Sequence, residues 1–166
     1  ALGDRINGAT TEAHVAVVFD WDNWHALEDA VGPVRDKRYH DTVSSHFAAV
    51  YAHNVAVDVV CPDSDLSRYK VVIAPMLWMV KDGFGEKIEA FVASGGTFIT
   101  TYLSGRVGET DLAFENGYPG PLSRVLGVWV QETDALYPGQ SNTIEMRDGR
   151  VYVCGRLADI THVTSA

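Results

Sequence analysis

Cysteine is scarce in this sequence of 166 residues, which contains only Cys61 and Cys154. Neither belongs to a C-x-x-C pair, and structural zinc sites and dithiol redox motifs need such pairs, so the sequence predicts neither kind of site. Two distant cysteines are typical of reduced, buried thiols in the cytoplasm, where disulfides are rare. We therefore expect both thiols to be free and buried, and the protein to be cytoplasmic.

Positive charge is also in short supply. Lys and Arg number 13 against 22 Asp and Glu, which gives a net charge of −9. Nucleic acids and anionic membrane surfaces are bound by clustered basic residues, and the sequence has only a small cluster at Arg35, Lys37 and Arg38. We therefore expect no nucleic-acid partner and no membrane partner.

Long apolar runs are missing as well. No run is long enough to span a bilayer, and the start, "ALGDRINGATTEAH", lacks the basic and apolar regions of a signal peptide. Apolar residues make up 46% of the chain and charged residues 21%, which is the composition of an ordinary globular domain. We interpret residues 1–13 as a linker or lead-in and residues 14–166 as one α/β domain.

Short apolar runs rich in β-branched residues alternate along the chain with segments of helical periodicity. We expect strands at residues 14–20, 55–61, 70–80 and 97–103, and helices at 39–54 and 83–94. Tyr39, Val43, Phe47 and Val50 follow helical spacing, so the first helix should bury these four side chains. Alternation of strand and helix implies parallel crossover units, and therefore an open, mainly parallel sheet with helices on both faces.

The ends of the later elements are marked by turn residues. Asp82 should cap the helix at 83–94, and Gly95-Gly96 should end it. We then expect a loop at 104–120, a short helix at 121–127, a strand at 128–133 and a hairpin at 142–155. Asp148-Gly149 favours a type I′ turn in that hairpin. No element is predicted for the last ten residues, "LADITHVTSA".

The stretch "VVFDWDNW", residues 17–24, brings an apolar strand directly into Asp20-x-Asp22. Haloacid-dehalogenase-type phosphatases present an aspartyl nucleophile and its acid partner in this way. In that alternative Asp20 attacks phosphorus and Asp22 protonates the leaving oxygen. The chain would then be a stand-alone phosphatase.

The rest of the phosphatase pattern is incomplete. Lys81 could supply its basic residue, and Thr100 or Thr101 its hydroxyl. Asn23-Trp24 stands where that family has Gly-Thr, and the chain has no late acidic pair that would hold the metal. A short motif without its context is weak evidence, so we keep the phosphatase only as the alternative.

Three loops combine aromatic and acidic residues: "DWDNWH", "MLWMV" and "LAFENGYPGP". Exposed aromatic side chains are favoured at protein interfaces and at surfaces that contact sugars. Apart from the Asp-x-Asp motif, no nucleophile, carboxylate pair or metal-ligand spacing stands out. The residues alone therefore describe an α/β domain without an assembled catalytic set.

Several stretches, in order, resemble the middle domain of the β-galactosidases of glycoside hydrolase family 42. They are "VAVVFDWDNWHALE" (15–28), "DSDLSRYKVVIAP" (63–75) and "GYPGPLSRVLGV" (117–128). The resemblance extends from about residue 14 to the end of the chain, and the last two stretches are its most specific parts.

This resemblance implies a flavodoxin-like fold, related to class I glutamine amidotransferases but without their nucleophile, that serves as a trimerisation domain. In the family it follows a (β/α)₈ barrel whose two glutamates remove terminal β-galactose with retention of configuration. We therefore expect no catalytic residue, metal ligand or cofactor in this chain. Its partners would be further copies of itself, in a homotrimer, while the barrel binds the galactoside.

The resemblance also gives the aromatic loops a role, because they would face a neighbouring subunit and the mouth of its sugar pocket. The candidates for this interface or pocket rim are Trp21, Asp22, Asn23, Trp24, His25, Trp78, Tyr102, Phe114 and Tyr118. Asp20 would accept hydrogen bonds from nearby backbone N–H groups. The family commonly carries two adjacent tryptophans where this chain has Trp24-His25.

Overall fold

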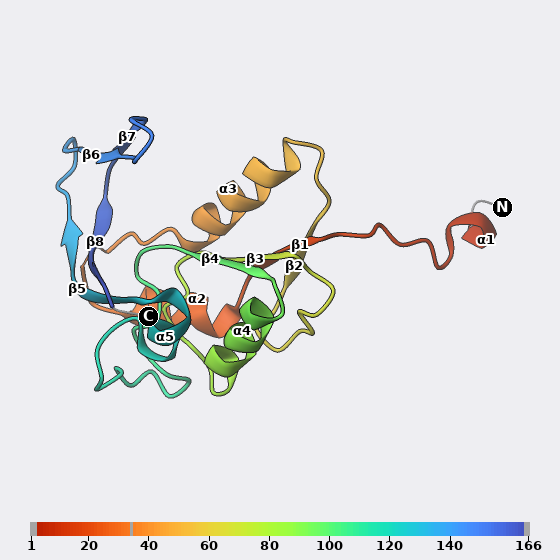
Figure 1. Ribbon diagram of the computed structural model, residues 1–166, viewed down its shortest axis with the longest axis horizontal. Helices are drawn as coiled ribbons and strands as arrows, with labels where there is room; N and C mark the ends of the chain where they lie inside the picture. The colour runs from red at the N-terminus through yellow and green to blue at the C-terminus, as the bar shows by residue number, and fades with distance from the viewer. Residues whose placement is uncertain (1–2, 34, 165–166) are drawn as a thin grey trace.

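A computed structural model describes residues 3–33 and 35–164. Its centre is a sheet of four parallel strands in the order β2-β1-β3-β4 (Figure 1). The strands are β1 (Val15–Val18), β2 (Val57–Val60), β3 (Val71–Ala74) and β4 (Thr97–Thr100). Each lies inside a predicted strand, so the predicted α/β class and mainly parallel sheet are confirmed.

Two helices cover the two faces of this sheet, as the alternation predicts. They are α3 (Tyr39–Tyr51) and α4 (Phe84–Ala93). Val17 of β1 packs in one apolar cluster with residues of α3, while its neighbours Ala16 and Val18 pack in a second cluster with Ile88 of α4. Because successive strand residues point to opposite faces, β1 contributes to both cores.

The inner face of α3 is narrower than the spacing predicts. Tyr39 and Val43 are buried, but Phe47 and Val50 are only half-buried. The ring of Phe47 stacks on Tyr51, with 5.7 Å between the centroids. The prediction that all four residues are buried is therefore wrong for the C-terminal half of the helix, where Phe47 and Val50 pack against the core cluster but stay partly accessible.

The segment after β1 is a helix, α2 (Trp21–Asp29), although it was predicted to be a loop. Asp20 precedes it in extended conformation and accepts the N–H of Asp22 on Oδ1 at 3.1 Å. This is the N-cap arrangement that satisfies a free N–H in the first helical turn. Ala26 and Leu27 are buried on the inner side. The expectation that Asp20 is a structural acceptor is confirmed.

The start of α4 differs from the prediction. Gly83, with φ of 75°, occupies the N-cap position, and no side chain caps the helix, so the expected cap by Asp82 is wrong. The helix is fixed instead by burial of Phe84, Ile88 and Phe91. Gly95 follows with φ of 98°, a backbone conformation that suits glycine, and the helix ends where predicted.

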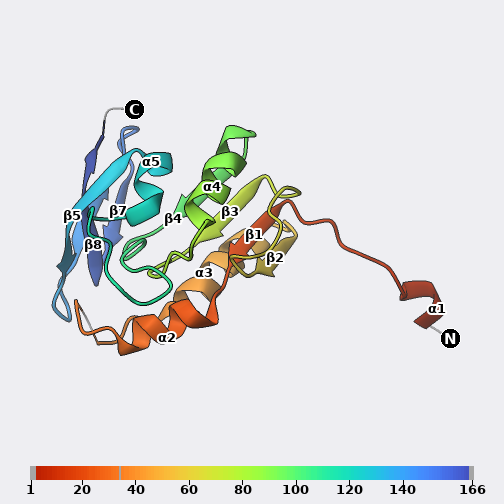
Figure 2. The same cartoon turned by 90° about the horizontal axis from the view of Figure 1, so that it is seen from below.

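The second half of the chain forms two antiparallel ribbons beside the sheet (Figure 2). The chain passes through η1 (Gly120–Leu122) and α5 (Ser123–Leu126) into β5 (Val128–Ala135), which pairs with β8 (Leu157–Val163). The second ribbon pairs β6 (Asn142–Glu145) with β7 (Val151–Cys154). Strand β8 was not predicted, because its sequence mixes polar and apolar residues without clear alternation.

The hairpin between β6 and β7 is confirmed, but its turn is not type I′. That turn needs positive φ at both central residues, and among the described residues with positive φ Gly149 is present and Asp148 is not. Met146 and Arg150 close the loop by a backbone hydrogen bond, and the N–H of Gly149 donates to Met146. The loop is therefore longer, with glycine only in its last position.

Both cysteines are free, as expected, but neither is buried. Cys61 is exposed and Cys154 is partly exposed. Each lies at the end of a strand, where the chain leaves the sheet or ribbon. The sequence rule that free cysteines are buried does not hold here.

Within the predicted lead-in the chain forms a short helix, α1 (Gly3–Ile6), which an extended segment separates from the sheet (Figure 1). Residues 1 and 2 of the predicted lead-in lie outside the described part of the chain. None of the helices described is both long and apolar enough to cross a bilayer.

Candidate functional site

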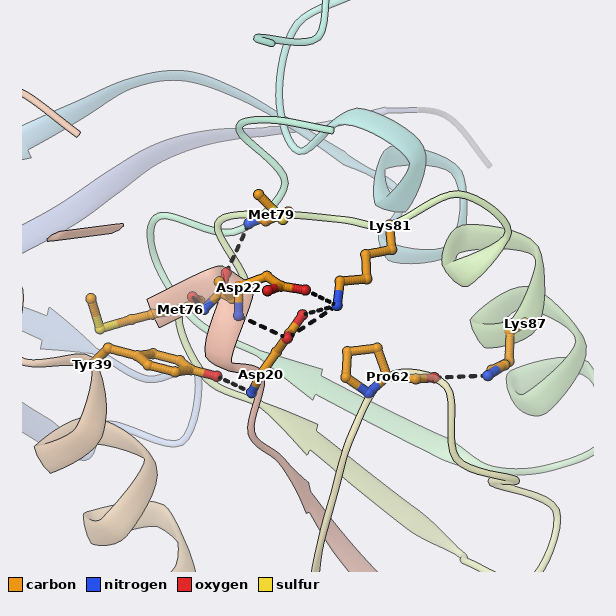
Figure 3. A network of polar contacts seen from close by, with 9 residues as sticks. Asp20, Asp22, Tyr39, Pro62, Met76, Met79, Lys81 and Lys87 are labelled. Atoms are coloured by element: carbon orange, nitrogen blue, oxygen red, sulfur yellow. Dashed lines mark hydrogen bonds and ion pairs between the residues drawn. The ribbon is translucent and has the colours of Figure 1, made fainter. Parts of the chain in front are cut away.

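An ion-pair cluster lies where β1 and β3 end (Figure 3). Asp20 lies two residues after the end of β1, and Lys81 comes from the loop after β3. The Lys81 Nζ atom is 2.7 Å from Asp22 Oδ2 and 3.2 Å from Asp20 Oδ2. Asp20 is only 5% exposed, so its charge is balanced inside the domain. Lys81 thus connects the start of α2 to the loop after β3.

The charges in this cluster reinforce one another. The hydrogen bond and the charge of Lys81 hold the pKa of Asp22 below its ordinary value. Burial acts to lower the pKa of Lys81, but its hydrogen bonds to Asp22 and Asp20 together with the charges of these two carboxylates outweigh burial and raise that pKa. Asp22 and Lys81 are therefore both ionised at neutral pH.

Asn23 joins the same two segments from inside the domain. Its side chain is fully buried, its Nδ2 atom donates to the carbonyl of Met76 at 3.1 Å, and its Oδ1 atom accepts the N–H of Met79 at 2.8 Å. The sequence made Asn23 an interface or pocket-rim candidate, whereas the structure places it in the interior. Its partners lie 53 and 56 residues away in sequence, so no local pattern could have identified them.

Tyr39, at the first turn of α3, also reaches the end of β1. Its hydroxyl oxygen accepts the N–H of Asp20 at 3.1 Å. Burial raises the pKa of Tyr39, although its hydrogen bonds to Asp20 and Asn23 act in the opposite direction, so the hydroxyl stays protonated. The sequence identified Tyr39 as a core residue but not as a partner of Asp20.

Hydroxyl groups hold the loops after β3 and β4 together. Thr101 Oγ1 accepts the N–H of Met76 at 2.9 Å, and Ser104 Oγ accepts the N–H of Leu77 at 3.0 Å. Thr100 Oγ1 donates to the carbonyl of Ala74 at 2.8 Å. These hydroxyls therefore fix the backbone at the ends of the strands.

This geometry gives the phosphatase alternative no support. A nucleophilic carboxylate must be free to approach phosphorus, but Asp20 is buried, caps α2 and contacts Lys81. The hydroxyls of Thr100 and Thr101 are occupied by backbone groups. Every candidate residue for that chemistry thus has a structural partner.

An aromatic surface lies beside the ion-pair cluster. The rings of Trp21 and Trp24 stack with 5.3 Å between centroids, and Phe19 meets the Trp21 ring edge-on at 5.3 Å. Trp21 is 62% exposed, Trp24 is half-buried, and His25 is exposed next to Trp21. A shallow apolar hollow adjoins these rings, and its other lining residues are His40, Val43, Ser44, Phe47 and Val59.

The remaining candidates do not all belong to that surface. Trp78 and Tyr102 are half-buried and pack against the core cluster on the α3 face. Phe114 packs against the cluster on the α4 face, and the ring of Tyr118 lies under the Arg106 guanidinium at 4.3 Å. The structure therefore groups Trp21, Trp24 and His25, and it distributes Trp78, Tyr102, Phe114 and Tyr118 over other contacts.

A buried charge pair, missed by sequence reasoning, connects the β5–β8 ribbon to the loop after β4. Arg106 Nη2 lies 3.0 Å from Asp159 Oδ1, and both side chains are almost fully buried. Asp159 Oδ2 also accepts the N–H of Leu103 at 3.1 Å. In the sequence Asp159 is an isolated acidic residue 53 positions from its partner, so no motif marks the pair.

Comparison with known proteins matches residues 13–166 to a family described as the β-galactosidase trimerisation domain. β-Galactosidase BgaP of Planococcus sp. strain L4 is 46% identical over 170 residues, which cover 99% of this chain and 25% of that protein. β-Galactosidase LacZ of Lactobacillus acidophilus is 41% identical over 164 residues, which cover 99% of this chain and 24% of that protein.

Solved structures agree with these relatives. The crystal structure of a β-galactosidase from Bacillus circulans sp. alkalophilus superposes with a TM-score of 0.95 and 47% identity, over 98% of this chain and 25% of that one. Gan42B, a GH42 β-galactosidase, gives a TM-score of 0.91 and 38% identity, over 96% of this chain and 23% of that one. The chain thus spans about a quarter of the length of these relatives.

Proposed function

Because this chain belongs to the trimerisation domains of the glycoside hydrolase family 42 β-galactosidases, we propose that it is the assembly segment of a longer β-galactosidase. Three copies would meet around a threefold axis. The two catalytic glutamates would lie on a barrel outside this chain and would hydrolyse terminal β-galactosides with retention. The chain alone would then be inactive on galactosides. The proposal is supported by the family match and by the share of the relatives that the chain spans.

We further propose that the domain is flavodoxin-like and related in fold to the class I glutamine amidotransferases. The strand order β2-β1-β3-β4 supports this, because it equals the first four positions of the 2-1-3-4-5 order of flavodoxin-like sheets. In such sheets the loops at the carboxyl ends of the strands carry the function. The aromatic surface lies at that edge.

The observation that carries the assembly proposal is the stacked pair of exposed Trp21 and half-buried Trp24 on a helix that is held in place at its first turn. Asp20 caps this helix, and Asn23 and Lys81 anchor its first turn to the loop after β3. Large aromatic side chains on rigid backbone are enriched in the centre of protein interfaces, where they bind at low entropic cost. A monomer would leave this apolar surface in water.

The polar candidates would serve the same surface in different ways. Asp22 and His25 are exposed and would form its polar rim. Asn23 would act from inside by holding the helix in place. The proposed contacts also include four residues that are only partly buried: Trp78, Tyr102, Phe114 and Tyr118. The net charge of −9 per copy opposes association, so salt should strengthen the trimer.

The parent protein would be cytoplasmic and would need no nucleic acid, membrane surface, metal or cofactor for this assembly. The two free thiols support a reducing compartment.

The test is Trp24→Ala in the full-length protein, with molar mass measured by light scattering and turnover measured on nitrophenyl galactoside. We expect a weaker trimer and lower activity, with the domain still folded. Trp129→Ala is the matched control, because Trp129 is 45% exposed but lies on the β5–β8 ribbon, stacked on His162. An unchanged trimer with unchanged turnover in Trp24→Ala would remove Trp24 from the interface.

A further inference from the structure

A closed ring of three copies needs two different surfaces on each copy. In such a ring one surface of a copy meets a different surface of the next copy, and the rotation closes after the third contact. Under the proposed function, the stacked rings of Trp21 and Trp24 and the apolar hollow beside them supply one of these surfaces. The surface that fits into this hollow must therefore lie elsewhere on the chain.

The hollow lies on the β2 side of the carboxyl edge of the sheet, since Val59 of β2 is part of its lining. The segment after β1 contributes Trp21 and Trp24, and α3 contributes the exposed Ser44 and the half-buried Phe47. Its volume is about 480 Å³, and none of its lining residues carries a carboxylate, an ammonium or a guanidinium group. This aromatic hollow therefore suits an apolar side chain that projects from its own backbone.

A projecting turn, residues 108–112, lies on the β4 side of the same edge, and we call it the tip loop. The N–H of Gly108 donates to the carbonyl of Leu112 at 2.9 Å, which closes the turn. Val107, just before the turn, forms a β-bridge to Met79 in the loop after β3. The tip loop is therefore fixed to the domain, and an ordered loop loses less entropy on binding than a flexible one.

Leu112 is the large apolar side chain of this turn. It is 71% exposed, whereas Val107 before the turn is 6% exposed and Phe114 after it packs against the core. Single exposed leucines are common, so exposure alone assigns no role. Leu112 differs in having a fixed backbone and exposed polar neighbours, because Glu109, Thr110 and Asp111 precede it. An apolar anchor with polar surroundings is the form of side chain that fills a pocket on a partner.

The charge of the tip loop limits where it can dock. Glu109 and Asp111 lie within the loop and Glu115 follows it, and all three are exposed. No ion pair among the described residues involves any of them. Because each copy carries a net charge of −9, its surface on average repels a further acidic loop. Docking therefore requires a region that is less acidic than the rest of the chain.

Such a region borders the aromatic hollow. A second, polar hollow shares Trp24 and His40 with it. Basic and acidic residues line this second hollow in equal number: Glu28, Arg35, Asp36, Lys37, Arg38 and Asp41. Arg38 already pairs with Asp36 at 2.6 Å, and Arg35 is exposed. The border is therefore balanced in charge, and it repels an acidic loop less than the chain does on average.

We propose that the tip loop of one copy docks on the next copy of this chain, with Leu112 in the aromatic hollow and the acidic residues of the loop toward Arg35. This rests on the trimer of the proposed function and deepens it, because it names both of the surfaces that meet. When three copies close into a ring, each hollow holds one tip loop and neither surface is left free for a fourth copy.

The first test joins the two surfaces covalently in the full-length protein, after Cys61, Cys154 and any other cysteine have been replaced by serine. Leu112→Cys and Ser44→Cys are introduced together and treated with a short bismaleimide. In a head-to-tail ring each copy is joined to both neighbours, so we expect a covalent trimer on a denaturing gel. Either variant alone should stay unlinked, and co-expression of the two single variants should give covalent dimers.

A second test fills the hollow from within one copy. Ser44 and Ser45 are adjacent and exposed on α3, but only Ser44 is among the residues that line the hollow. Ser44→Trp should raise the concentration at which the trimer dissociates by about tenfold or more, as expected for loss of an anchor, while Ser45→Trp leaves it unchanged. Leu112→Ser should weaken the trimer in the same way, and the conservative Leu112→Met should not. Light scattering over a dilution series measures dissociation, and circular dichroism verifies the fold.

The molar mass of the unmodified full-length protein separates this inference from the proposed function. A monomeric protein would overturn both. A trimeric protein whose double cysteine variant gives no covalent trimer would leave the proposed assembly standing and overturn this pairing of surfaces. The same holds for a trimer that Ser44→Trp and Ser45→Trp affect equally.

Discussion

At the carboxyl ends of β1 and β3, buried polar side chains find partners within the chain, whereas the β6–β7 hairpin exposes its apolar side chains to solvent. Asn23 accepts the N–H of Met79, and Lys81 donates to Asp20. Both hydrogen bonds join residues that are more than fifty positions apart in the sequence. On the hairpin, Val151 is 59% exposed and Val153 is 77% exposed. A two-stranded hairpin is only marginally stable by itself. The first region is therefore held by its own contacts, while the second has little packing within the described chain.

The largest expected difference in the free energy of unfolding is that between two matched Ile→Ala substitutions, one in each region. Ile88 on α4 is fully buried, so Ile88→Ala should lower the free energy of unfolding by about 2–5 kcal/mol. Ile144 on β6 is 50% exposed, and Ile144→Ala should cost less than about 1 kcal/mol. Urea denaturation followed by circular dichroism measures both. Equal losses would show that the hairpin is packed as tightly as the sheet.

A smaller loss is expected at Asn23. Asn23→Ala leaves the N–H of Met79 and the carbonyl of Met76 buried without partners, so the free energy of unfolding should fall by about 2–4 kcal/mol. His25→Ala, on the same helix but exposed, is the control and should change it by less than about 0.5 kcal/mol. A stable Asn23→Ala variant would mean that water replaces the side chain, and that the loop after β3 is less closed than described.

The ion-pair cluster gives a pH-dependent effect that should be smaller still. The pKa of Asp22 in the folded chain lies below its ordinary value of 3.8, so its pairing with Lys81 stabilises the fold above that pH and is lost as pH falls further. Wild type should therefore exceed Asp22→Asn in stability at pH 7, and the difference should vanish at acidic pH below the folded pKa. Because Asp22 is exposed, added salt should also reduce the difference.

Urea midpoints of the two proteins at a series of pH values give this difference directly. The raised pKa of Lys81 means that the pair should persist on the alkaline side until Lys81 loses its proton, above 10.5. A difference that is constant from neutral to strongly acidic pH would contradict an ionic contribution and would point to a packing effect of the Asn side chain.

Local patterns explain which parts of the fold could be predicted. The β1 sequence "VAVV" is short, β-branched and buried, so periodicity alone identifies a strand of a parallel sheet. Helix α2, "WDNWHALED", has only Ala26 and Leu27 as buried apolar residues, and its strongest signal was Asp20 as an N-cap. From the sequence we interpreted this aspartate as part of an Asp-x-Asp motif or as an acceptor in a loop, not as an N-cap, so the helix was missed.

The site was harder to predict than the fold, because its contacts are not local. The family resemblance identified the stretch that contains Trp21 and Trp24, and the structure places these two rings together. The resemblance could not show that the side chain of Asn23, which lies between the two tryptophans in the sequence, points inward. That orientation depends on backbone groups more than fifty residues away. The pairing of Arg106 with Asp159 depends in the same way on how the ribbon packs on the sheet.

The smallest effect is expected on the outer face of the hairpin. Val153→Ser removes apolar surface that is already mostly in water, so the free energy of unfolding of the chain should change by no more than about 0.5 kcal/mol. The matched change on the sheet is Val17→Ser, because Val17 is fully buried and its replacement would bury a hydroxyl as well as lose packing. Both variants are compared by urea denaturation of the chain. A loss above about 1 kcal/mol for Val153→Ser would show that this face of the hairpin packs against something within the chain, and the contrast between the two regions would fail at its weaker side.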